Sequence, residues 1–188
     1  LHLKGNILWR EIIGFALDYG LSVQGLAQLE AGLPDEERIS GKAKGNFSGD
    51  SIELAQLSLE AENHAMGFVL QGLVSGLEGD ALTLDTRAEW HNLHWPLESE
   101  TPEFTSAAGS LQIKGPLDDY QLELAADLEG ADIPSGQWQA HGSGDLQQFK
   151  LNGMSALILG GELSATGLMT WDPAPAWQLR LAGSDLDP

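Results

Sequence analysis

The chain has 188 residues, 42% of them hydrophobic, and it contains no cysteine. Its length suits one ordinary domain with a sizeable buried surface, and the lack of cysteine excludes disulfides and thiolate metal sites. The formal charge is −19, from 28 acids against 9 bases. This charge disfavours nucleic acid and anionic membrane surfaces as partners, because phosphate binding depends on clustered Lys and Arg.

The first part of the chain fits two periodicities. Residues 8–19 place apolar side chains at helical spacing, whereas Phe15–Val23 alternates as a strand does. We favour a strand after Ile13, followed by a short helix over Gln24–Gly32. The polar stretch over residues 33–40 is interpreted as a loop or kink between repeats, and it is a weak sub-boundary at most.

Apolar and polar residues alternate almost everywhere from residue 41 on. Gly41–Gly49 predicts one strand with a polar outer face, because its lysines alternate with small or apolar residues. The run that begins at Ile52 changes phase near Ala55 and Gln56, which predicts a β-bulge. A further strand is predicted over Leu82–Trp90.

A glycine-bounded strand pattern occurs three times in the second half, with starts 27 and 25 residues apart. The three copies are Gly109–Gly115, Gly136–Gly142 and Gly161–Gly167. Each copy is followed by a turn signal and a second alternating run, so the pattern predicts sequential hairpins. Recurrence at a near-fixed period is typical of stacked β units, with regular repeats over about residues 109–188. The predicted fold class is all-β, an elongated β-solenoid of short antiparallel strands with little helix.

Motifs for catalysis are not found, so we expect no catalytic residues, no metal site and no cofactor. The chain lacks a nucleophile elbow, a phosphate-binding glycine loop and a His-Glu-x-x-His pair. His91 and His94 face opposite sides of a strand, and the pair Asp118–Asp119 falls in a turn. The acidity is interpreted as a solvated exterior, with a calcium role as the alternative.

Six tryptophans are spread along the chain, and two interpretations of them stay open. Large rings fill core space above glycines, or they line a groove for an apolar or sugar ligand. The six are Trp9, Trp90, Trp95, Trp138, Trp171 and Trp177.

Several segments together resemble the repeats of the TamB family, the translocation and assembly module subunits among the AsmA-like, bridge-like lipid-transfer proteins. The resemblance is dense from about Thr86 to Pro188 and weaker before it. The segments that carry it are Trp90–Leu97, Gly109–Gly115 with Leu117–Tyr120, Pro134–Trp138, Gly144–Leu146, Leu159–Gly161 and Thr170–Pro173.

The resemblance implies a fold and a role. Members of the family are anchored in the inner membrane of Gram-negative bacteria, span the periplasm as a β-taco-like trough with an apolar concave face, and pair with an outer-membrane barrel of the TamA type. They are implicated in outer-membrane protein assembly, protein secretion and phospholipid movement. The chain, residues 1–188, is then one repeat segment from the central part of a longer protein, without the anchor and without the region that meets the barrel.

An apolar trough of this kind would hold phospholipid acyl chains away from water. The alternation predicts which side chains point inward. They are Leu111, Ile113, Leu122, Leu124, Trp138, Leu151, Leu163, Trp171, Leu179 and Leu181.

Two other classes of function stay open on the sequence. A closed β scaffold would bind protein clients by strand-edge pairing, and its end strands would also permit edge-to-edge self-association. A carbohydrate-binding module would need its aromatic rings exposed beside polar residues.

Overall fold

The computed structural model describes residues 2–8, 13–24, 36–61, 65–79, 81–95, 102–172 and 174–187, with side chains described from residue 40 onward. The described residues form strands joined by turns. These are β1 (His2–Leu8), β2 (Ile13–Gln24), β3 (Glu36–Ser48), β4 (Ser51–Ala61), β5 (Met66–Ser75), β6 (Thr83–Trp95), β7 (Phe104–Pro116), β8 (Tyr120–Gly130), β9 (Gly136–Gly144), β10 (Gln148–Ile158), β11 (Gly161–Thr170) and β12 (Ala176–Ser184).

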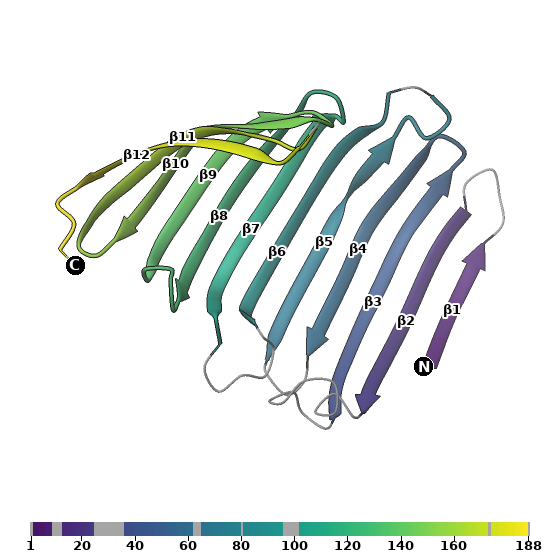
Figure 1. The fold of residues 1–188 in the computed structure, drawn as a ribbon. Helices are drawn as coiled ribbons and strands as arrows, with labels where there is room; N and C mark the ends of the chain where they lie inside the picture. Colours follow the sequence, from purple (N-terminus) through teal and green to yellow (C-terminus); the bar gives the residue numbers. More distant parts are fainter. Residues whose placement is uncertain are drawn as a thin grey trace.

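All twelve strands belong to one antiparallel sheet, and their order in the sheet is their order in the chain. The sheet is open, with β1 and β12 at its two edges. Figure 1 shows it as a twisted, curved surface whose C-terminal strands turn away from the plane of the earlier ones. The predicted all-β class is confirmed, and the open sheet does not favour a closed scaffold.

The ambiguity near the N-terminus resolves toward strand. β2 occupies Ile13–Gln24 and pairs with β3 along its whole length, so the strand predicted after Ile13 is confirmed. The short helix that was predicted over Gln24–Gly32 lies outside the described residues, apart from Gln24 at the end of β2.

Each predicted glycine-bounded run is the first strand of a hairpin. The three runs lie in β7, β9 and β11, and their partners along the chain are β8, β10 and β12. The β7–β8 turn is closed by a hydrogen bond from the Asp119 amide to the Pro116 carbonyl oxygen, 2.9 Å. Gly115 adopts a φ of 110° at this turn, a conformation that glycine reaches without the steric cost of a Cβ.

The predicted bulge is present on β4. Lys44 pairs with Gln56 and Gly45 pairs with Leu54, so Ala55 is the extra residue. A second register shift lies on β10, where Leu151 and Gly153 flank the irregularity. The sequence pattern of apolar residues changes phase at the bulge, and the extra residue compensates for that change. Apolar side chains on both sides of the bulge therefore lie on a single face of the sheet.

The β9–β10 turn is held by one carboxylate. Asp145 Oδ1 accepts hydrogen bonds from the Gln147 and Gln148 backbone amides, at 2.7 and 2.9 Å, and Oδ2 accepts one from the Gln148 side chain at 3.2 Å. The bond from the Gln147 amide, supported by those from Gln148, lowers the pKa of Asp145 below its usual value of 3.8.

Replacing Asp145 with alanine is expected to destabilise this hairpin at neutral pH. Because the folded-state pKa is lowered, the stabilisation is fully present above the unfolded-state pKa and is lost as the pH falls through the lower folded-state pKa. In urea unfolding at pH 7, the midpoint of D145A should therefore be lower than that of the wild type. The difference between the two midpoints should be smaller at pH 3.

Asp118→Ala in the β7–β8 turn is the matched control, because no hydrogen bond to the Asp118 carboxylate from the described residues is seen. Its midpoint should change less than that of D145A at pH 7. A gap between the wild type and D145A that stays constant from pH 7 to pH 3 would contradict the assigned role of the carboxylate.

Candidate functional site

One face of the sheet is uncharged and almost entirely apolar over the strands whose side chains are described. Antiparallel partners share a face, so the register defines rows of side chains that run across the strands. The central row is Ala43, Leu57, Leu70, Ala88, Leu111, Leu124, Ala140, Met154, Ala165 and Leu181. The tryptophan row, two residues along, is Gly41, Leu59, Phe68, Trp90, Gly109, Ala126, Trp138, Ala156, Leu163 and Gly183.

Two further rows lie on the other side of the central row. The glycine row is Gly45, Leu54, Gly72, Thr86, Ile113, Leu122, Gly142, Leu151, Gly167 and Leu179. The turn-side row is Phe47, Ile52, Val74, Leu84 and Gly115, continued by Tyr120, Gly144, Phe149, Met169 and Trp177. No residue in these four rows of the described side chains carries a charge. We call this surface the apolar face.

The opposite surface is polar and carries the basic residues. The bases with described side chains all lie there, and all are exposed: Lys42, Lys44, Arg87, Lys114, Lys150 and Arg180. Three exposed leucines, Leu73, Leu157 and Leu168, are scattered among them. We call this surface the outer face.

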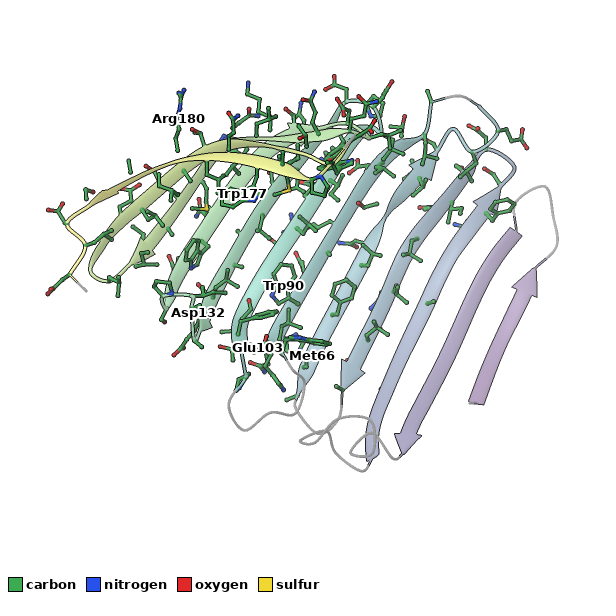
Figure 2. The ribbon with its side chains drawn as sticks, in the orientation of Figure 1. Met66, Trp90, Glu103, Asp132, Trp177 and Arg180 are labelled. Carbon is green, nitrogen blue, oxygen red and sulfur yellow. The ribbon has the colours of Figure 1, made fainter. Side chains whose placement is uncertain are left out.

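The sheet curls toward its apolar face at the C-terminal end. Figure 2 shows Trp177 on the inner side of the curl formed by β12, on the same side of the sheet as Trp90, whereas Arg180 points away from it. The exposed fractions of Trp177 and Leu181 are 70% and 64%, so the apolar face stays accessible on the last strand. Together the curl and the four rows make a trough.

The predicted inward residues fall on this face with one exception. Leu111, Leu124 and Leu181 lie in the central row, Trp138 and Leu163 in the tryptophan row, and Ile113, Leu122, Leu151 and Leu179 in the glycine row. Contact of these residues with a ligand stays a prediction.

Trp171 lies outside the rows. It follows the end of β11, its backbone amide donates to the Gln147 carbonyl oxygen at 3.0 Å, and its indole Nε1 donates to the carbonyl oxygen of Leu146. The side chain is 40% exposed. These bonds tie the β11–β12 connection to the β9–β10 turn.

Several residues of the apolar face were not singled out on the sequence as inward residues. Some of them lie on strands before the regular repeats, and others lie within the repeats beside the predicted leucines. They include Phe68, Trp90, Tyr120, Phe149, Met154 and Trp177. The alternation of β4 to β6 was the signal that could have extended the inward set toward the N-terminus.

Trp90 lies flat against Gly109 of the neighbouring strand. A Cβ built at Gly109 would stand 2.1 Å from Trp90 Cζ2, so only glycine leaves room for the ring. Trp90 Nε1 donates to Ser106 Oγ at 2.8 Å, and Ser106 is 1% exposed. Ser106 Oγ in turn donates to the Ala108 carbonyl oxygen at 3.2 Å. For this ring, the interpretation that tryptophan fills space above glycine is confirmed.

The same pairing of ring and glycine recurs near the turn-side row. Phe149 covers Gly142, and Tyr120 covers Gly144. Burial, reinforced by the negative charge of Asp145, raises the pKa of Tyr120 above its usual value of 10.0. In these places a large ring thus lies over a glycine of a neighbouring strand.

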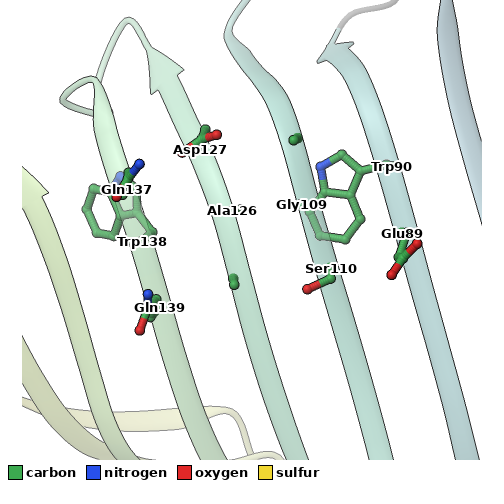
Figure 3. Close-up of a pocket in the computed structure, with 11 residues that line it drawn as sticks. Glu89, Trp90, Gly109, Ser110, Ala126, Asp127, Gln137, Trp138 and Gln139 are labelled. Carbon is green, nitrogen blue, oxygen red and sulfur yellow. The ribbon is translucent and has the colours of Figure 1, made fainter.

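Trp138 differs from Trp90 in its polar atom. Its Nε1 is buried and has no hydrogen-bond partner among the described residues. Figure 3 shows Trp138 on β9 and Trp90 on β6, with Gly109 and Ala126 on the two strands between them. These rings lie on a face without charged residues, which disfavours the carbohydrate-binding interpretation.

The hollows on the protein belong mainly to the outer face. One hollow of about 500 Å³ is lined by the outer-face row Glu89, Ser110, Ala125 and Gln139, and by Asp127 and Gln137 of the next row. Residues of the tryptophan row also line it, namely Trp90, Gly109, Ala126 and Trp138. Over the part of the chain that the structure describes, no group of three or more His, Asp or Glu side chains is arranged to hold a metal ion.

Comparison with known proteins identifies the family. The model of the TamB N-terminal domain matches residues 12–188. The chain belongs to the TamB family. No curated protein and no solved structure matches it. The matched domain is the N-terminal one, whereas the sequence resemblance had suggested a central section of the TamB protein.

The match extends the resemblance from the C-terminal repeats to nearly the whole chain. It identifies the trough as part of a TamB-type envelope protein, a family of transport and assembly components. Within the described residues, no helix is long and apolar enough to cross a membrane.

The packing of Trp90 on Gly109 yields a stability prediction. Gly109→Ala should displace the indole and break its bond to Ser106, because the added Cβ would overlap the ring. Overpacking of this kind costs about 1–3 kcal/mol, and we expect a loss of that size in the free energy of unfolding from urea titrations followed by tryptophan fluorescence.

Gly79→Ala is the control. The nearest atom to a Cβ added at Gly79 is the Gly76 carbonyl oxygen at 3.9 Å. This substitution should therefore change the free energy of unfolding by no more than about 0.5 kcal/mol. The double variant Ser106→Ala/Gly109→Ala should lose less unfolding free energy than the sum of the losses in the two single variants, because both changes disrupt the contacts of the same ring. Full additivity would argue against the shared contact.

Proposed function

We propose that this chain carries phospholipid by its acyl chains along the apolar face. The observation that supports this most directly is the run of four uncharged rows that cross every strand from β3 to β12 on an open sheet. Contiguous apolar surface of this extent is uncommon on soluble proteins and marks an interaction site. Membership in the TamB family points to the same kind of role.

The chemistry of the face suits hydrocarbon. Each methylene removed from water contributes about 0.8 kcal/mol, so two acyl chains are held without any polar contact. Three residues of β12 offer such contacts to an acyl chain. They are Trp177, Leu179 and Leu181, whose exposed fractions are 70%, 49% and 64%. The open side of the trough leaves the polar headgroup in water.

The wider role that we propose follows from the family. The chain would act in the periplasm of a Gram-negative bacterium, within a protein anchored in the inner membrane. It would move phospholipid between the inner and outer membranes and support outer-membrane protein assembly and secretion, with a TamA-type barrel as the partner of other regions. No step of this role needs a catalytic residue or a cofactor.

Leu181→Asp should weaken acyl-chain binding, and Ala182→Asp should not. The two neighbours lie on β12, both are exposed and both variants add one negative charge, but Leu181 is on the apolar face and Ala182 on the outer face. Loss of one methylene contact corresponds to about a four-fold change in the dissociation constant, so we expect L181D to weaken binding by at least that factor.

The measurement is quenching of tryptophan fluorescence by a phosphatidylcholine with brominated acyl chains. Glycerophosphocholine, which has no acyl chain, should not quench. Circular dichroism and the thermal midpoint test whether both variants keep the wild-type fold. Equal quenching of L181D and A182D, or no quenching of the wild type, would contradict the proposed function.

A further inference from the structure

The trough separates charge in a way that bears on which phospholipid it takes. The strand connections form two rims. The turn-side rim joins β3–β4, β5–β6, β7–β8, β9–β10 and β11–β12, and the opposite rim joins β4–β5, β6–β7, β8–β9 and β10–β11 and includes the residues after β12. Both rims border the apolar face along its length.

The charged side chains described on the rims are all carboxylates. On the turn-side rim they are Asp50, Glu78, Asp118, Asp119, Asp145 and Asp172. On the opposite rim they are Glu103, Asp132, Asp185 and Asp187. Figure 2 shows Glu103, just before β7, and Asp132, in the β8–β9 connection, on this second rim.

The described bases lie on strands of the outer face, and two of them pair with acids of that face. Arg87 pairs with Glu89 at 2.8 Å, and Lys114 lies 3.9 Å from Asp85. Lys150 lines the same hollow as Asp118, Asp119 and Asp145. The described rim residues themselves carry ten carboxylates and no base, so both rims have an excess of negative charge.

A lipid held on the apolar face must place its headgroup beside a rim. The four rows hold no charged partner, and an unpaired phosphate buried there would pay a large desolvation cost. The acyl chains lie on the apolar side chains, and the headgroup stays in water at the border of the trough. The charged groups of the described rim residues at that border are carboxylates.

We propose that the rims select phospholipids by headgroup charge, favouring a zwitterionic headgroup that bears an ammonium over an anionic one. This inference rests on the proposed function. A glycerol headgroup leaves the net charge of the phosphate exposed to repulsion from the rims. An ethanolamine headgroup cancels that charge and presents its ammonium to the carboxylates.

The selection is electrostatic and therefore depends on salt. At 10 mM ionic strength the screening length is about 30 Å, so several rim carboxylates act on one headgroup, whereas at 1 M it is about 3 Å. The ratio of bound ethanolamine lipid to bound glycerol lipid should be about three or more at low salt, and it should approach one at high salt.

The test is a competition for uptake. The protein is loaded from a non-ionic detergent with equimolar dioleoyl phosphatidylethanolamine and dioleoyl phosphatidylglycerol, and bound lipid is quantified by mass spectrometry. The two lipids share their acyl chains, so the bound ratio reports the headgroup alone. We expect an excess of the ethanolamine lipid at 10 mM salt that disappears at 1 M.

Matched variants locate the effect. D118N/D119N/D172N removes rim charge, and E123Q/D127N/E162Q removes the same charge from the outer face. The rim variant should lose most of the preference, and the outer-face variant should keep it. Both leave Asp145 and its turn intact, and circular dichroism verifies the fold.

Equal uptake of the two lipids by the wild type at 10 mM salt would overturn the headgroup selection and leave the proposed function standing. An equal effect of the two variants would overturn the assignment to the rims. Uptake of neither lipid would overturn the proposed function itself, and the selection with it.

Discussion

The register between neighbouring strands is the constraint on which the rest of this structure depends. A side-chain period of two means that a slip of one residue would transfer a whole strand's apolar set to the other face. Eleven consecutive pairings keep the same phase here, even where Ala55 or the bulge on β10 adds a residue. The apolar face exists as a continuous surface only because no pairing loses that phase.

Side-chain size is the second condition for a continuous trough. Large rings from one strand lie over glycines of the next, as Trp90 does over Gly109 and Phe149 over Gly142. This packing provides cover without a second layer, so the single sheet buries small residues such as Ala156, which is 1% exposed. An open sheet with such a floor offers hydrocarbon contacts and still has no closed core.

Local signals in the sequence were enough to predict much of this fold. The alternation, the glycine-bounded repeats, the turn residues and the phase change at Ala55 are each encoded within a few residues, and each is present in the structure. What sequence reasoning missed depends on neighbouring strands. That Trp90 covers Gly109, or that Trp171 bonds to the Leu146 carbonyl oxygen, follows from register across a turn, which no single strand reveals.

The order of the strands has a consequence for length. Each strand pairs only with its neighbours in the chain, so a hairpin inserted or deleted would leave every other pairing unchanged. Strands lie about 4.8 Å apart, which means that each hairpin lengthens the sheet by about 10 Å. The length of a sheet of this design is therefore adjustable in fixed increments, by copying a pair of strands.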